Sequence, residues 1–161
     1  GKILQIDNPT RVYDTPTNQF VGSFIGNPPM NFMRGRVRRE NGRVNVMIGD
    51  FPLNPPTEMH APLTAYDGKD VLVGIRAENM ATLSAPTADA LPVNVDVVEP
   101  IGSQNLLTIR VGDGMIKVST HPDFPAGTDT PVWLRFPMQK IRWMDWDSGR
   151  AIAPSLDAIV A

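Results

Sequence analysis

Residues 107–119 read LTIRVGDGMIKVS, and this stretch decides the fold class of the chain. Apolar Leu107 and Ile109 alternate with polar residues before the turn, and Ile116 and Val118 do so after it. The turn itself is Gly-Asp-Gly, which suits a tight reversal between two antiparallel strands. The stretch therefore predicts a β-hairpin with one buried face.

Similar runs lie on both sides of this hairpin. In residues 44–48, 93–97 and 132–136, valine, isoleucine, leucine or phenylalanine recurs at every second position. Residues 71–75 are almost continuously apolar, and residues 141–146 form a last strand-like run. About seven short strands separated by turns are typical of a small barrel or sandwich. We therefore expect residues 33–161 to be mainly β.

The first 32 residues follow a different pattern. Residues 2–6 predict a short strand, and Asn8 followed by Pro9 is the start signal of a helix. Thr15 and Pro16 end that helix and repeat the signal for a second one. The second helix would carry an apolar stripe on one face. The stripe consists of Phe20, Val21, Phe24 and Ile25. About 30 residues cannot bury such a stripe alone, so it needs a partner surface.

Composition excludes several classes of protein. The chain has 161 residues, of which 42% are hydrophobic and 20% charged, enough for one domain with a real core. Its 16 prolines and 13 glycines break the chain too often for a long helical bundle. The lack of cysteine excludes disulfide scaffolds, zinc-thiolate sites and cysteine nucleophiles. A net charge of −2 gives no general attraction to nucleic acid. Because Gly1 is not a natural start, we expect a piece of a longer protein.

The sequence contains no recognisable catalytic motif. Gly68-Lys69 is followed by Asp70 and lacks the spacing of a phosphate-binding loop, so it predicts a turn. His60 and His121 have no second ligand at the spacing of a helical metal site, and we expect both in exposed loops. No serine lies in a Gly-x-Ser-x-Gly elbow. We therefore predict no catalytic, cofactor-binding or metal-ligating residues in this chain.

Two clusters leave alternatives open. The basic cluster consists of Arg34, Arg36, Arg38, Arg39 and Arg43. Alternate arginines on a strand could track a phosphate backbone, but few aromatic residues lie nearby, and a solvated strand face is the simpler interpretation. The aromatic cluster consists of Trp133, Phe136, Trp143 and Trp146. It could stack on sugars or bases, although packing in the core is favoured. Asp145 and Asp147 suit the capping of a turn.

Three segments of the sequence resemble a known family. The first segment comprises GKILQI at 1–6, PTRVY at 9–13 and FVGSFIGNPPMNF at 20–32. The second is GIRAENM at 74–80, and the third is VVEPIGS at 97–103. The first resembles the closing segment of the ATPase domain in bacterial ABC importers of the maltose and glycerol-phosphate type. The other two resemble motifs of the regulatory domain that follows it, although Ala77, Asn79 and Gln104 depart from the family pattern.

The resemblance implies a fold, a function and a set of partners. Residues 1–32 would be the tail of the ATPase domain, and residues 33–161 an OB-like, transport-associated regulatory and dimerisation domain, related to molybdate-pocket domains. The chain alone would not be an enzyme, and Mg-ATP would bind only the full-length parent, which takes up a sugar or polyol. Its partners would be a second copy, its own ATPase domain and the permease subunits, with a regulatory protein left open and no nucleic acid. The parent would lie at the cytoplasmic face of the bacterial inner membrane. The alternative is an oligonucleotide- or oligosaccharide-binding OB module, and a small-oxyanion module lacks an obvious pocket motif.

Three groups of residues carry these expectations. The regulatory dimer contact is assigned to Glu99, Gly102, Ser103, Gln104 and Asn105, with an ordinary solvated loop as the alternative. The structural family motif is assigned to Gly74, Arg76 and Glu78, with Arg76 and Glu78 pairing on a continued strand. The alternative for Arg76 and Glu78 is an exposed regulatory contact. Packing on the ATPase domain is assigned to Phe20, Val21, Phe24 and Ile25.

Overall fold

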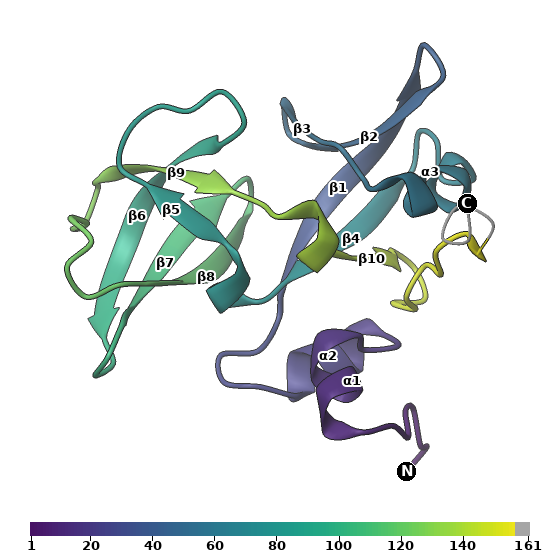
Figure 1. Ribbon diagram of the computed structural model, residues 1–161, viewed down its shortest axis with the longest axis horizontal. Helices are drawn as coiled ribbons and strands as arrows, with labels where there is room; N and C mark the ends of the chain where they lie inside the picture. Colours follow the sequence, from purple (N-terminus) through teal and green to yellow (C-terminus); the bar gives the residue numbers. More distant parts are fainter. Residues whose placement is uncertain (157–161) are drawn as a thin grey trace.

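The computed structural model describes residues 1–156 and confirms a mainly β fold of the OB type with a few short helices. Within this range, two curled sheets of five strands each lie side by side, in the orders β10-β4-β1-β2-β3 and β5-β9-β6-β7-β8 (Figure 1). The strands are β1 (Asn31–Glu40), β2 (Arg43–Ile48), β3 (Phe51–Leu53), β4 (Asp70–Ile75), β5 (Ala81–Leu83), β6 (Leu91–Pro100), β7 (Asn105–Val111), β8 (Gly114–Thr120), β9 (Pro131–Arg135) and β10 (Arg142–Asp145). The α-helices are α1 (Pro9–Asp14), α2 (Gln19–Phe24) and α3 (Thr57–Thr64), and the 3₁₀ helices are η1 (Ala77–Asn79) and η2 (Met138–Lys140).

The predicted hairpin is confirmed as β7–β8. The two strands pair from Asn105 opposite Thr120 to Val111 opposite Gly114. Gly112 has a φ of 58°, the left-handed conformation that the tight turn requires. Leu107 is fully buried, as the alternation predicts. This hairpin forms one end of the second sheet.

Both sheets contribute to one core. Val46 and Val73 of the first sheet and Leu107 and Leu134 of the second are fully buried in the same cluster. Within the first sheet, Gly35 of β1 lies against side chains of the two adjacent strands, and an added Cβ would lie 2.5 Å from Val46 Cγ1 of β2 and 2.9 Å from Val73 Cγ2 of β4. Only glycine fits there without displacing the neighbouring strand.

The N-terminal helices are capped by side chains, and one of the two expected caps is wrong. Asn8 Oδ1 accepts a hydrogen bond from Arg11 N at 2.9 Å, which confirms the start of α1. The second helix is capped by Asn18, which accepts from Val21 N at 2.9 Å, and not by Thr15. The Asn18 amide oxygen reaches the free N–H groups that begin α2. Gly26 has the expected left-handed φ, at 105°.

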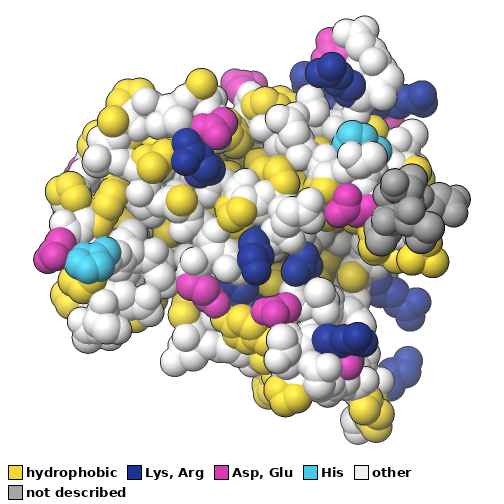
Figure 2. Space-filling model, in the orientation of Figure 1, with side chains coloured by type: hydrophobic (Ala, Val, Ile, Leu, Met, Phe, Trp, Pro, Cys, Tyr) yellow, Lys and Arg dark blue, Asp and Glu magenta, His cyan; other side chains and the backbone are white. Residues whose placement is uncertain are grey.

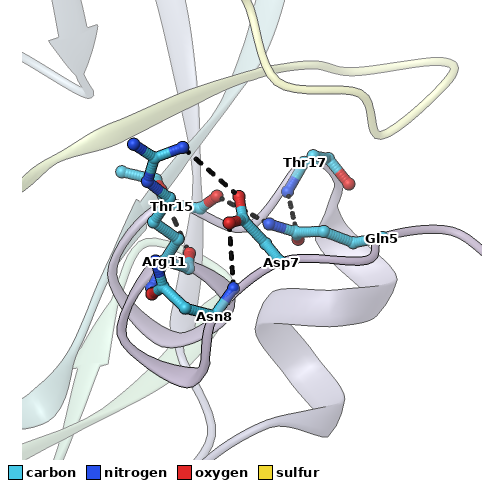
Figure 3. A network of polar contacts seen from close by, with 6 residues as sticks. All are labelled: Gln5, Asp7, Asn8, Arg11, Thr15 and Thr17. Carbon is cyan, nitrogen blue, oxygen red and sulfur yellow. Dashed lines mark hydrogen bonds and ion pairs between the residues drawn. The ribbon is translucent and has the colours of Figure 1, made fainter.

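The strand expected over residues 2–6 is wrong. This segment has no regular secondary structure and pairs with no strand of the described chain. Instead, Gln5 bridges the loop after α1, donating to Thr15 O at 3.3 Å and accepting from Thr17 N at 3.0 Å (Figure 3). The side-chain amide of Gln5, and not backbone pairing with a strand, thus holds this segment to the loop after α1.

The alternation in β6 changes at a bulge. The expected inward face was Val93, Val95 and Val97, but the pairing register with β7 shifts between Val95 and Val97. A bulge inserts an extra residue and reverses which side chains face the core. Val97 is therefore 43% exposed, and Val98 packs against the core instead.

His60 lies in α3, not in the loop that its neighbouring prolines suggested. The helix contains Pro62, which cannot donate to the carbonyl of Glu58. Ser155 N donates to that carbonyl instead, at 2.7 Å, and His60 Nε2 lies 2.8 Å from Pro55 O. The freed acceptor is satisfied from outside the helix, so the prolines do not prevent it. His121 is exposed, as expected.

Candidate functional site

The motif residues Arg76 and Glu78 hold the N-terminal segment instead of each other. The strand ends at Ile75, and Glu78 lies in η1, so the expected strand continuation and pairing are wrong. Arg76 lies over the ring of Tyr13, with Cζ 4.0 Å from the ring centroid, and the Tyr13 hydroxyl donates to Glu78. Burial and the bond to the Glu78 carboxylate raise the pKa of Tyr13 to about 12. The tyrosine therefore stays neutral and remains a donor.

Gly74 is the third motif residue, and its small size is required by packing. A Cβ at this position would lie 2.9 Å from Phe32 Cε1 and 3.0 Å from Met30 Sδ. These two side chains cross over β4 where the chain enters β1. Gly74 thus lets the start of the first sheet pack closely on β4.

The turn from Glu99 to Asn105 is the tip of the β6–β7 hairpin. Pro100 pairs with Asn105, Ile101 N donates to Gln104 O at 2.9 Å, and Gly102 has a φ of 90°. Glu99 is exposed and forms an ion pair with Lys117 of β8 at 3.2 Å. The turn is therefore at the rim of the second sheet, as expected.

The apolar stripe of α2 has two parts with different exposure. Val21 is buried within the chain, whereas Phe20 and Phe24 are 63% and 75% exposed. The two phenyl rings stack on each other, with centroids 5.8 Å apart and an interplanar angle of 9°. The partner surface that the stripe needs is thus supplied within the chain for Val21, but not for Phe20 and Phe24.

A small apolar groove lies beside these rings. It has a volume of about 230 Å³. Its lining residues are Lys2, Ile3, Leu4, Gln5, Val12, Phe20, Val21, Phe24 and Ile25. Figure 2 shows hydrophobic side chains along the edge of the molecule where Figure 1 places α1 and α2. This is the most apolar exposed region of the N-terminal segment.

The arginine face of β1 is partly neutralised by one carboxylate. Arg34, Arg36 and Arg38 share the exposed face, as predicted. However, Asp70 of the neighbouring strand forms ion pairs with Arg34 at 2.7 Å and with Arg36 at 3.0 Å. Arg34 also lies over the Trp146 ring at 4.8 Å. These contacts favour the interpretation of a solvated strand face.

An open hollow of about 1000 Å³ is lined by residues of both sheets. Its charged lining residues are Arg34, Asp96, Arg110, Asp113 and Asp129. Carboxylates outnumber guanidinium groups there, so the hollow does not favour a nucleic-acid backbone. Within residues 1–156, no group of three potential metal ligands comes together.

The aromatic cluster belongs mainly to the core and its margin. Trp143 and Phe136 are buried, and Trp146 is 41% exposed. Beside them, Asp145 caps the following turn by accepting from Ser148 N at 2.7 Å and Asp147 N at 3.0 Å. These backbone bonds, with that from the Tyr66 hydroxyl, lower the pKa of Asp145 despite its desolvation. Asp145 thus has the expected capping role, while Asp147 contributes only its N–H.

Two contacts of importance were not foreseen from the sequence. The sequence predicts Tyr13 only as part of a helix, because nothing local indicates a partner 63 residues away. Asn31 binds β8 through both atoms of its amide, donating to Lys117 O at 2.7 Å and accepting from Lys117 N at 2.8 Å. The side-chain amide of Asn31 thus makes the two hydrogen bonds that the backbone of a neighbouring strand would make, and it joins the first sheet to the second.

Two protein-family descriptions match this chain. The MalK OB fold domain matches residues 26–80, and the TOBE domain matches residues 73–144. The helices of the described residues include none that is long and apolar enough to cross a bilayer. The expected OB-like, transport-associated domain is therefore confirmed.

Curated relatives extend the similarity to almost the whole chain. The trehalose/maltose import ATP-binding protein MalK of Thermococcus litoralis is 33% identical over 159 residues, which cover 94% of this chain and 42% of that protein. The sn-glycerol-3-phosphate import ATP-binding proteins UgpC of Escherichia coli O157:H7 and Salmonella typhi are 33% identical over 154 residues, covering 94% of this chain and 41% of each relative. The chain thus spans about two fifths of the length of these relatives.

A solved structure shares the fold. The cytoplasmic molybdate-binding protein ModG, crystallised with molybdate bound, superposes with a TM-score of 0.56. The alignment covers 70% of this chain and 94% of that one, at 14% sequence identity. At this identity the likeness concerns the fold alone.

Proposed function

Since this chain belongs to the OB and TOBE domain region of MalK-type ABC importer ATP-binding subunits, we propose that it is the regulatory and dimerisation part of such a subunit. The observation that supports this most is the pair of overlapping domain matches, which together run from residue 26 to residue 144. The intact subunit would hydrolyse Mg-ATP to drive uptake of a sugar or polyol. This chain would contribute no catalytic residue.

We further propose that the N-terminal segment, residues 1–32, completes an ATPase domain. Ile3, Ile6, Phe20 and Phe24 are all more than half exposed. Leaving such side chains in water forgoes roughly 1.5–3 kcal/mol each. The relatives' names describe ATP-binding proteins, and this chain spans only about two fifths of their length. The groove beside the Phe20–Phe24 pair would therefore seat on the ATPase domain of the same subunit, with residues 33–161 as the regulatory domain.

The remaining partners follow from this assignment. The intact subunit would associate with permease subunits at the cytoplasmic face of a bacterial inner membrane. Two copies would meet through their regulatory domains. The transported substrate would be selected by the permease and the binding protein.

For the dimer contact we propose the tip of the β6–β7 hairpin. Glu99, Ser103 and Gln104 present polar groups at the rim, and Ile101 is also exposed there. The Glu99–Lys117 pair offers one negative and one positive group close together. A two-fold axis can exchange such partners between subunits, so the patch is self-complementary.

Glu99→Lys is expected to lower the dimer fraction without unfolding the chain. The substitution places a cation beside Lys117 and near its own symmetry mate. An exposed ion pair contributes little to folding, so the free energy of unfolding should change by less than about 1 kcal/mol. Light scattering coupled to size-exclusion chromatography measures the effect at equal protein concentration.

Asp89→Lys is the matched control. Asp89 is also exposed and paired with an arginine, Arg135, at 3.1 Å, but it is remote from the turn. The Asp89→Lys variant should leave the dimer fraction unchanged. Equal dimer fractions for wild type and Glu99→Lys would show that the turn is an ordinary solvated loop.

A further inference from the structure

Arg76 is an arginine buried without an acidic partner. Its side chain is 2% exposed, at the junction between the first sheet and the N-terminal segment. Among the described residues its guanidinium takes part in none of the ion pairs. Burial accordingly lowers the pKa of the group from its ordinary value. A buried cation of this kind persists only when strong acceptors surround it.

The acceptors are backbone carbonyls at the ends of α1 and α2. Arg76 Nη2 donates to Tyr13 O at 2.8 Å. Nη1 donates to Ile25 O at 2.5 Å and approaches Gly22 O at 3.3 Å. The last carbonyls of a helix have no partner within the helix. One guanidinium thus satisfies free acceptors of both helices at once.

The surroundings fix the guanidinium in one position. The Tyr13 ring covers its face, and Glu78 holds the tyrosine by its hydroxyl. A Cβ at Gly26 would lie 2.7 Å from Nη1 and 3.1 Å from Tyr13 Cε2, so the chain passes close to the group. Arg76 Nε is buried and has no hydrogen-bond partner in the part of the chain that the structure describes. The group is therefore oriented for its Nη contacts at the expense of Nε.

We propose that Arg76 is a positioning residue that sets the angle between the α1–α2 segment and the barrel. Arg142 gives support from β10 by donating from Nε to Asp14 O at 2.6 Å. The segment then has two faces, one held by Arg76 and one exposing the Phe20–Phe24 pair. This inference rests on the proposed function only where it makes the exposed face the seat of an ATPase domain. In that setting Arg76 would fix the orientation of the barrel relative to the ATPase domain when the ATPase domain moves.

Lysine cannot replace this arginine. A guanidinium is planar and presents donors in several fixed directions, whereas an ammonium is a single point of donation. Arg76→Lys would keep the charge and lose the simultaneous contact to both helices. Arg76→Met would remove every donor while retaining a long apolar stem.

The test is a distance measurement between two spin labels on the isolated chain. Because the sequence contains no cysteine, Ser23→Cys in α2 and Arg38→Cys in β1 give two unique exposed labelling sites. Pulsed electron resonance should give one narrow distance in the otherwise wild-type chain. Arg76→Met should lose that narrow distance, and Arg76→Lys should broaden it. The near-ultraviolet circular dichroism of the buried Trp143 should persist in both, which shows that the barrel remains folded.

Two further variants complete the design. Arg135→Met removes an exposed, ion-paired arginine and should leave the distance unchanged. Gly26→Ala retains Arg76 but crowds its Nη1 and strains the left-handed backbone there, so it should also disturb the distance. If Arg76→Met does not fold, the comparison of Arg76→Lys with the wild-type chain decides the matter. An unchanged narrow distance in the folded Arg76 variants and in Gly26→Ala would overturn the proposal. No ATPase domain takes part in the measurement, so its result is independent of the proposed function.

Discussion

Replacing Phe20 and Phe24 together by aspartate is expected to leave the isolated chain folded and to separate the barrel from the ATPase domain in an intact subunit. In the isolated chain both rings are largely exposed and stack mainly on each other, so little packing is lost. In the intact subunit each buried ring would contribute roughly 1.5–3 kcal/mol to docking. Two carboxylates at the contact would add a desolvation cost.

Scanning calorimetry measures this difference. The wild-type intact subunit should unfold with the two domains coupled, and the Phe20→Asp/Phe24→Asp variant should show two separate transitions. Met115→Asp is the matched control, because Met115 is also an exposed apolar side chain but lies in β8 of the second sheet. A single unchanged transition in the double variant would show that the phenyl rings do not meet the ATPase domain.

Trp143→Ala is expected to destabilise the chain far more than Trp146→Ala. Trp143 is 4% exposed and belongs to the common core, so truncation leaves a cavity and should cost about 3–5 kcal/mol. Trp146 is 41% exposed, and its main specific contact is the Arg34 guanidinium at 4.8 Å. Removing such an exposed cation–π contact should cost about 0.5–1 kcal/mol.

Urea denaturation of the two variants measures these costs side by side. Trp143→Ala should move the midpoint strongly to lower urea, and Trp146→Ala only slightly. Equal shifts would contradict the assignment of Trp143 to the core and Trp146 to its margin. The comparison also separates core packing from the alternative in which the tryptophans form one ligand-stacking surface.

The alternation of apolar residues predicted most of the β structure correctly. The β7–β8 hairpin could be predicted because its signal is local, namely two alternating runs and a glycine turn. The exposed arginine face of β1 follows from the same period of two. In contrast, Val97 was misplaced because a bulge depends on the pairing with β7, which the sequence of β6 alone does not contain.

Long-range partners explain the other differences. Pro62 disfavours a helix because it has no N–H to donate to Glu58 O. In the fold, the backbone N–H of Ser155, far along the chain, donates to that carbonyl instead. Likewise, Arg76 and Glu78 were expected to pair because they are neighbours in sequence. Both instead engage Tyr13 of a segment that precedes the barrel. A motif can identify important residues, but the partner that each one contacts is decided by the fold.

Hydrogen exchange of α2 tests most directly whether the N-terminal segment joins this barrel to an ATPase domain. The amides to follow are Gly22 N and Ile25 N, which donate to Asn18 O at 3.2 Å and Val21 O at 3.0 Å. Docking worth more than about 1.4 kcal/mol should slow their exchange at least about tenfold in the intact subunit relative to the isolated chain. The amides paired between β7 and β8 should exchange equally in both and serve as the internal reference. Equal exchange of the α2 amides in the two proteins would contradict the account.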